Sequence, residues 1–197
     1  MVIAMCTPAC LVTSTPSFDP PQQTRPFLVP SSADPDPRGI LIVDSLNLPT
    51  YFEFTANVVS NDANEKVDLK LYLDYGFTNV AGQPFRKSIG SPASLDASTM
   101  DNDKRPPARI KWYPGLEPID MGCHTMTLIA SHHFDDTMEC PVCRNDSSQI
   151  TWPVFRCDSS NPIDTPCSAD FGACTEWKDT CHEQADPDAG VACGAAP

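Results

Sequence analysis

The chain has 197 residues, including 21 prolines and 10 cysteines, and carries a formal net charge of −13. This length predicts one domain of ordinary size with appendages. The acidic balance excludes the basic surface that nucleic-acid binding requires, because lysines and arginines must displace counterions from the phosphates. It mainly indicates a well-solvated surface. No stretch reaches the roughly 18 to 20 consecutive apolar residues of a membrane-spanning helix.

The distribution of the cysteines predicts an oxidising compartment. Two lie within the first ten residues and eight lie between positions 123 and 193. Cytosolic proteins rarely gather so many thiols in a short segment, whereas exported proteins use disulfides to constrain the unfolded chain. We therefore expect the eight downstream cysteines to pair: Cys123, Cys140, Cys143, Cys157, Cys167, Cys174, Cys181 and Cys193.

Residues 1–10, MVIAMCTPAC, resemble the end of a bacterial lipoprotein signal. In such signals a small residue precedes a cysteine that becomes the acylated first residue, as Ala9 precedes Cys10 here. The resemblance implies lipidation of Cys10 and a location in the cell envelope, on the outer or cytoplasmic membrane and facing an oxidising space. The segment has no leading Lys or Arg and a short apolar run, so we expect the start to lie upstream. A disordered terminus with two incidental cysteines is the alternative.

Residues 11–39 are expected to form a proline-rich linker. Seven prolines lie between positions 16 and 37. Such a segment has few backbone donors and favours extended polyproline II, which makes a semi-rigid spacer. A spacer of this kind suits a tether between a membrane anchor and a folded domain.

Residues 40–157 show the period-two alternation of half-buried strands. The pattern predicts strands near 40–44, 51–58, 67–75, 108–113, 123–132 and 150–155, with polar turns between them. The second and third of these form a hairpin or cross between two sheets. Pro153 cannot donate to a ladder, so its strand is expected at a sheet edge or with the proline nitrogen facing outward. Residues 90–104 are expected to form a long polar loop.

This series of strands, with Trp152 shortly before Cys157, resembles immunoglobulin-like or fibronectin-type-III-like domains. The resemblance implies an all-β fold, an antiparallel sandwich of two sheets. The second strand contains no cysteine, so the inter-sheet disulfide typical of antibody domains is not available. Residues 158–197, with a net charge of −7 and four cysteines, are expected to form an acidic, disulfide-rich and mostly irregular tail.

The segment HHFDDTMECPVC places two histidines shortly before a Cys-x-x-Cys pair. A zinc site would use Cys140 and Cys143 as thiolates, with two further ligands from His132, His133 or Cys157. No second half-site has a matching pattern, and an oxidising compartment favours disulfides. If residues 123–132 and 148–157 form a hairpin whose paired numbers sum to 280, Cys123 lies opposite Cys157. We therefore expect a Cys123–Cys157 disulfide.

Other candidate sites are weaker. Ser131, His132 and Asp135 contain the residue types of a hydrolase triad, but neighbours on a strand point to opposite faces and no G-x-S-x-G motif is present. His124 lies on the expected core face, where a hydrogen-bonded imidazole is commoner than a ligand. The aspartates of residues 96–103 fit no calcium loop and suit a solvated loop better.

These observations favour a membrane-anchored, extracytoplasmic lipoprotein that acts as a non-enzymatic binding or structural module. Its expected partners are the membrane, through the lipid on Cys10, and a protein or glycan ligand; nucleic acid and cofactors are not expected. The alternative is a zinc-dependent or redox enzyme that uses His132, His133, Cys140 and Cys143.

Overall fold

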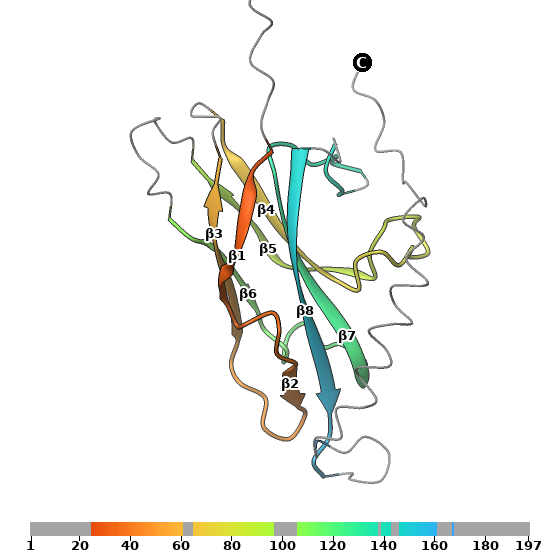
Figure 1. Ribbon diagram of the computed structural model, residues 1–197. Helices are drawn as coiled ribbons and strands as arrows, with labels where there is room; N and C mark the ends of the chain where they lie inside the picture. Colours follow the sequence, from red (N-terminus) through yellow and green to blue (C-terminus); the bar gives the residue numbers. More distant parts are fainter. Residues whose placement is uncertain are drawn as a thin grey trace, which may run out of the picture.

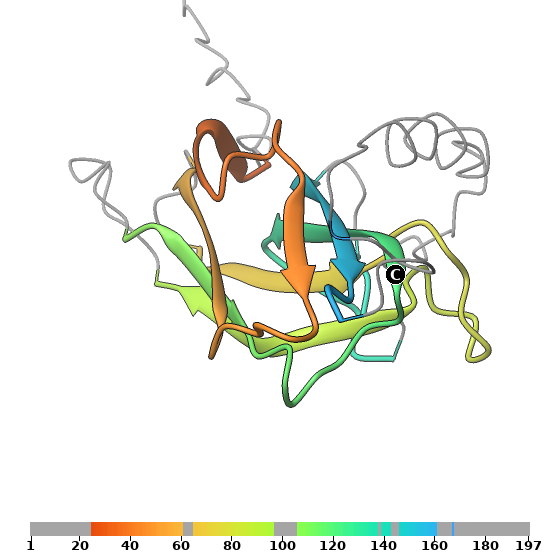
Figure 2. The ribbon, with the colours of Figure 1, turned by 90° about the horizontal axis from the view of Figure 1, so that it is seen from below.

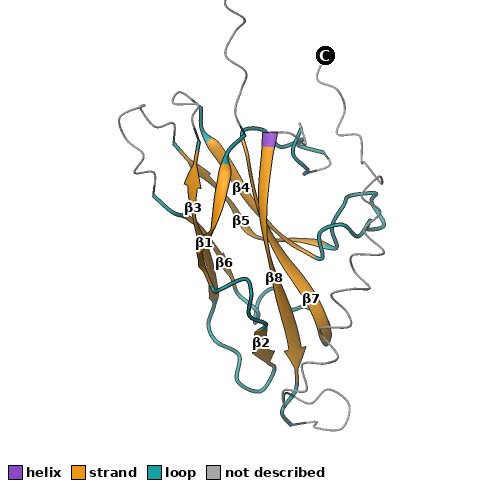
Figure 3. Cartoon of the chain, in the orientation of Figure 1, coloured by secondary structure: helices purple, strands orange, loops and turns teal. Residues whose placement is uncertain are grey.

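The computed structural model describes residues 25–60, 65–96, 106–137, 139–142, 146–160 and 167. Strands dominate these residues, and loops of varied length connect them (Figures 1 and 3). The strands are β1 (Phe27–Asp34), β2 (Leu41–Asp44), β3 (Phe52–Val59), β4 (Val67–Leu73), β5 (Lys87–Leu95), β6 (Ala108–Trp112), β7 (Gly122–Ser131) and β8 (Ser147–Cys157).

The strands form two sheets, as the sequence pattern predicts. One has the order β1-β3-β6 and the other the order β2-β8-β7-β4-β5. All neighbouring pairs run antiparallel except β2 and β8, which are parallel. The prediction of an all-β protein built from two sheets is therefore confirmed, with one parallel pair as an exception to the antiparallel rule.

The core lies between the sheets and consists of the inward residues of the alternating strands. Phe54 of β3 meets Trp152 of β8 edge to face, with ring centroids 5.0 Å apart. Both indole nitrogens are satisfied: Trp152 Nε1 donates to Pro35 O and Trp112 Nε1 donates to Glu117 O. Large aromatic side chains thus fill the core without leaving these donors unpaired.

The strand-bearing region begins at Phe27 rather than at residue 40. Residues 27–34, expected within the linker, form β1 and pair with β3, with Leu28 opposite Val58. Leu28 is buried in the core. Its proline made the segment look like part of the linker. The proline is tolerated because β1 is an edge strand, where a missing N–H leaves no partner unpaired.

Part of the expected long loop is also a strand. Residues 90–95 belong to β5, and the pairing of β4 with β5 shifts between Leu69–Ala93 and Leu71–Ile89. This bulge contains Gly90, which has a φ of +65°. A glycine is required here because β5 approaches β6 closely: an added Cβ would lie 2.5 Å from Lys111 O.

We expect Gly90→Ala to destabilise the fold by about 2 to 4 kcal/mol. The positive φ costs a non-glycine residue about 1 to 2 kcal/mol, and the contact with a backbone oxygen adds an overpacking cost. Gly115→Ala is the matched control, because an added Cβ there meets nothing within 4 Å. Urea unfolding of both variants measures the difference. Equal stability of the two variants would contradict the close approach of β5 and β6.

The sheet order answers two questions that the sequence left open: how β3 connects to β4, and where the strand with Pro153 lies. β3 and β4 belong to different sheets, so the segment between them crosses the sandwich and is not a hairpin. β8 is an interior strand, flanked by β2 and β7, but β2 pairs with it only from Val154 onward. Pro153 therefore lies where β2 has not yet begun, which explains how an interior strand accommodates a proline.

Candidate binding surface at the loop end

Two loops lie side by side at one end of the sandwich. Residues 45–51 connect β2 to β3, and residues 113–121 connect β6 to β7; Figure 2 shows both at the end that faces the viewer. Ser45 Oγ lies 3.7 Å from Met121 Sδ, and the rings of Tyr51 and Tyr113 are 5.9 Å apart. The contacts join segments about 70 residues apart in the chain.

These loops expose large apolar side chains. We call this set the loop-end patch: Leu46 (64% exposed), Leu48 (37%), Tyr51 (43%), Tyr113 (36%), Leu116 (81%) and Met121 (42%). Scattered exposed apolar residues are ordinary on a protein surface, but a group of six on two adjoining loops is typical of an interaction site. Aromatic residues and Met are also enriched where proteins bind one another.

The loop-end patch lies opposite the end at which the described chain enters the domain. The start of β1 pairs with the end of β3, since Phe27 lies opposite Val59, whereas residues 45–51 lead into the start of β3. Figure 1 shows β1 beginning at the upper end and the loop after β2 at the lower end. The start of β1 and the loop-end patch therefore lie at opposite ends of the sandwich.

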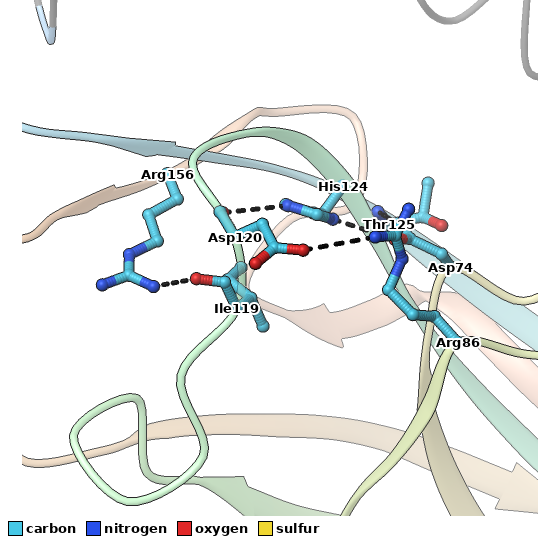
Figure 4. Close-up of polar contacts among 7 residues, drawn as sticks. All are labelled: Asp74, Arg86, Ile119, Asp120, His124, Thr125 and Arg156. Atoms are coloured by element: carbon cyan, nitrogen blue, oxygen red, sulfur yellow. Dashed lines mark hydrogen bonds and ion pairs between the residues drawn. The ribbon is translucent and has the colours of Figure 1, made fainter. Parts of the chain in front are cut away.

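A cluster of charged groups holds residues 119 and 120 of the second loop (Figure 4). His124 Nε2 lies 3.0 Å from Asp120 O, and Arg86 contacts the Asp120 carboxylate at 3.3 Å. Arg156 donates to Ile119 O and, through Nε, to Ser45 Oγ at 3.2 Å. Arg156 thus connects both loops of the patch to β8.

Asp74 is the buried centre of this cluster. Its carboxylate forms an ion pair with Arg86 Nε, lies against His124 Nδ1 and accepts a hydrogen bond from the backbone N–H of Thr125, each at 2.9 Å. Asp74 also has a φ of +50°, a conformation that Asp adopts more readily than most residues. These three contacts compensate for removing the carboxylate from water. We call Asp74, Arg86, Asp120 and His124 the Asp74 cluster.

Another carboxylate at this end is Asp44, at the end of β2. It accepts hydrogen bonds from Leu46 N, Asn47 Nδ2 and the Ser159 hydroxyl. Because these bonds favour the ionised form, the pKa of Asp44 falls from 3.8 to about 2. Asp44 therefore fixes the turn that presents Leu46 and joins it to the residues after β8.

We expect the Asp44 carboxyl to titrate near a pKa of about 2 in the folded protein. A lowered folded-state pKa means that the contribution of Asp44 to stability is complete above about pH 4. It is then lost as the pH falls toward 2. Carbon-13 NMR titration of the side-chain carboxyl measures the midpoint directly. A midpoint at the ordinary value of 3.8 would contradict the hydrogen bonds to Leu46 and Ser159.

The predicted histidine and cysteine ligands do not form a shared metal site among the residues described. His132 is buried and His133 is exposed, so the two rings face different surroundings. Cys140 is in a disulfide, which removes the thiolate that zinc would need. Cys143 lies outside the described residues. Within the described part of the chain, no three His, Cys, Asp or Glu side chains gather as metal ligands.

His132 belongs to a polar group that the sequence did not indicate. Its Nδ1 lies 2.6 Å from Asp146 Oδ1, and its Nε2 lies 3.5 Å from Ser60 Oγ. Serine hydrolases use the same three residue types, with the histidine between the serine hydroxyl and the aspartate carboxylate. Here the ring is fully buried and the hydroxyl lies at the outer limit of a hydrogen bond. These features favour a structural connection among β3, β7 and the start of β8.

Ser131, His132 and Asp135, the residue types of a triad that the sequence did not favour, do not form one through Ser131. The Ser131 hydroxyl donates to the backbone oxygens of His133 and Asp146 rather than to an imidazole. His124 is buried and hydrogen-bonded, as expected for the core face. Of the three acidic loop residues considered for calcium, only Asp96 is described, at the end of β5.

The expected Cys123–Cys157 disulfide is wrong. Cys157 is bonded to Cys167, with Cα atoms 5.2 Å apart. The paired residue numbers of β7 and β8 sum to 278, so Cys123 lies opposite Phe155. Cys123 and Cys140 are also in disulfides. The lipidation candidate Cys10 and the cysteines Cys174, Cys181 and Cys193 lie outside the described residues.

A second surface feature is a shallow hollow of about 240 Å³ on the outer face of the five-stranded sheet. Its lining mixes the charged residues Asp68, Lys70 and Asp136 with Phe134. The Lys70 ammonium lies 5.0 Å from the centre of the Phe134 ring and 3.9 Å from Glu139. These internal contacts already occupy the lysine, so the loop-end patch is the stronger candidate.

No known family model matches the sequence, and no curated protein matches it closely enough to be a relative. Across the described ranges, no helix has the length and apolar character needed to cross a membrane.

Proposed function

We propose that this protein is a lipid-anchored, extracytoplasmic binding module without enzymatic activity, and that the loop-end patch contacts its partner. The observation that carries the proposal is the gathering of six exposed apolar side chains at the end opposite the chain entry. In the proposed arrangement, acylated Cys10 holds the protein in the cell envelope. Residues between Cys10 and β1 serve as the tether, and the patch faces away from the membrane.

The proposed partner is a protein with an apolar groove. Leu46, Leu116 and Met121 supply aliphatic surface, for which an apolar groove offers a better match than a glycan with its many hydroxyls. Tyr51 and Tyr113 add aromatic rings whose hydroxyls can remain at the wet rim of an interface.

We also propose that the domain is immunoglobulin-like. Its strand order, β1-β3-β6 against β8-β7-β4-β5, corresponds to the division of an immunoglobulin sandwich into two sheets. The short β2 adds to the second sheet beside β8. Such sandwiches commonly present binding residues on the loops at one end, which supports a binding role for residues 45–51 and 113–121.

The zinc or redox alternative has less support. Zinc binding requires Cys140 as a thiolate, whereas Cys140 is in a disulfide. It also requires His132 at a metal, whereas this ring is fully buried and its Nε2 lies 3.5 Å from Ser60 Oγ.

We expect the double substitution Leu46→Asp and Leu116→Asp to reduce partner binding at least about 100-fold. Central apolar contacts are worth about 2 kcal/mol or more each, and a buried unpaired carboxylate adds a further cost. Val80→Asp is the matched control, since Val80 is exposed but lies on the loop between β4 and β5, away from the patch. Quantitative mass spectrometry of envelope proteins retained by each immobilised variant measures binding. Equal retention by all variants would contradict the proposal.

A further inference from the structure

The shallow hollow on the outer face of the five-stranded sheet forms where β5 separates from β4. The two strands pair at Leu69–Ala93 and again at Leu71–Ile89, so β5 has three residues between these points where β4 has one. One of the three is Pro92, which has no N–H to donate to a ladder. Bulges of this kind are frequent next to active sites, because they redirect side chains. We call the resulting space of about 240 Å³ the β4–β5 hollow.

The loop between β7 and β8 supplies one wall of the β4–β5 hollow through Phe134 and Asp136. This loop is fixed to the sheet, because the Tyr72 hydroxyl donates to Glu139 O. Phe134 also forms an isolated β-bridge with Pro141. A wall that is already in place needs little ordering when a ligand binds.

Two carboxylates in the lining are available to a ligand. Asp68 pairs with Lys66 at 3.2 Å, but the Lys66 side chain is 60% exposed, and an exposed ion pair of this kind is worth less than about 1 kcal/mol. The Asp136 carboxylate has no hydrogen bond or ion pair among the residues that the structure describes. Both carboxylates can therefore accept hydrogen bonds from a bound molecule.

Lys70 adds a positive charge to the same lining. Its side chain is only 15% exposed, and its ammonium lies 5.0 Å from the centre of the Phe134 ring and 3.9 Å from the Glu139 carboxylate. Both distances exceed that of a hydrogen bond. These contacts therefore hold the ammonium in position without using its N–H groups, which remain able to donate to a ligand.

The mixture of charges favours a neutral ligand that carries hydroxyl groups. An anion would meet the carboxylates of Asp68 and Asp136, and a cation would meet the ammonium of Lys70; placing like charges together is costly. A hydroxyl avoids both costs, because it donates to a carboxylate and accepts from an ammonium. Hydrogen bonds to charged groups are also stronger than those between neutral groups.

The remaining lining is apolar and comes from Pro92, Ala93 and the ring of Phe134. A sugar ring has the matching combination, with hydroxyls around its edge and C–H groups on its faces. The volume of about 240 Å³ equals that of about eight water molecules in the liquid, at roughly 30 Å³ each. Such a space suits one sugar ring, from which a longer chain would extend into solvent.

We infer that the β4–β5 hollow binds one residue of a neutral saccharide. Asp68 and Asp136 accept from its hydroxyls, Lys70 donates to a hydroxyl oxygen, and Phe134 contacts its C–H groups. The hollow shares no residue with the loop-end patch, so the inference does not rest on the proposed function.

Protein-observed nitrogen-15 NMR of the full chain tests the inference with defined sugars. The neutral probes are the methyl glycosides of glucose, galactose and mannose, and N-acetylglucosamine. We expect at least one of them to shift the amide signals of residues 68–70, 93–94 and 134–136 in a saturable way. For a ligand of this size the Kd should be on the order of 1 to 10 mM. Glucuronate and glucosamine, which carry a negative and a positive charge, should bind more weakly than their neutral counterparts.

Two alanine variants complete the test. Asp136→Ala should weaken binding of the same sugar about tenfold, the effect of losing one hydrogen bond to a charged group. Asp120→Ala is the matched control, because its carboxylate is 80% exposed and lies in the loop between β6 and β7, and it should bind as the unmodified protein does. The inference is overturned if no neutral probe gives saturable shifts at these residues up to roughly 100 mM, ten times the weakest expected Kd. It is also overturned if a charged probe binds more tightly, or if Asp136→Ala binds as well as Asp120→Ala.

Discussion

Replacing Asp74 with alanine is expected to lower the free energy of unfolding by about 3 to 5 kcal/mol. The substitution removes a buried carboxylate that pairs with Arg86, contacts His124 and accepts a hydrogen bond from Thr125 N, and it leaves these partners uncompensated. Part of the loss comes from placing alanine at a φ of +50°. Chemical unfolding at neutral pH measures the change. A protein of this size commonly has a total stability of about 5 to 15 kcal/mol, so the variant is expected to be marginal.

Two controls separate the contributions. Asp74→Asn keeps the shape and tolerates the positive φ, so its loss reports the missing charge. Asp120→Ala removes a carboxylate that is 80% exposed, and an exposed ion pair is worth less than about 1 kcal/mol. If Asp74→Ala costs no more than Asp120→Ala, Asp74 is not the structural centre of the cluster.

The second large effect is expected at Cys10. In a cell that processes lipoproteins, the protein should partition into the detergent phase with membranes. Cys10→Ala should move nearly all of it to the aqueous phase. The reason is that one acyl chain gives weak membrane binding, whereas the several chains of a processed lipoprotein cysteine give stable anchoring.

Cys6→Ala is the matched control for this experiment. Under the proposed cleavage before Cys10, Cys6 is removed with the leader, so its substitution should leave partitioning unchanged. Mass spectrometry of the mature N-terminus confirms the position of the modified residue. Equal partitioning of Cys10→Ala and the unmodified protein would show that Cys10 is not the anchor.

The sequence predicted the strands whose alternation is strong. β3, β4 and β6 each place apolar residues at every second position, and their inward faces meet in the core. β1 and β5 were missed because they combine prolines or small polar residues with few core side chains. Leu28 and Ile89 are among the few residues of these strands that reach the core. A strand that contributes so little to the core gives a weak period-two signal.

The register of β7 and β8 could not be read from alternation. A slip of one residue would exchange the two faces, but a slip of two residues preserves them. The expected and observed pairings differ by two residues, so both bury the same side chains, such as Leu128 and Trp152. The pattern therefore had no means of distinguishing a Cys123–Cys157 contact from the observed Cys123–Phe155 contact.

The loop-end patch could not be predicted from the sequence, because its residues come together only in the fold. Leu46 and Leu116 each look like an ordinary apolar residue in a polar loop. They become a surface only because β2 joins β8 and β6 leads into β7 at the same end of the sandwich. One feature of the sequence could have indicated the patch. Both loops contain large apolar side chains at positions where Gly, Pro, Asn, Asp or Ser would be enough to form a turn.

Photo-crosslinking in intact cells tests the central claim most directly. A photoreactive amino acid replaces Leu116 in the lipid-anchored protein, with the same residue at Val80 as the control. The proposed function predicts a discrete adduct with an envelope protein from position 116, absent from position 80 and abolished by Leu46→Asp on the neighbouring loop. No adduct from position 116, or the same adducts from both positions, would contradict the claim that the loop-end patch is a binding surface.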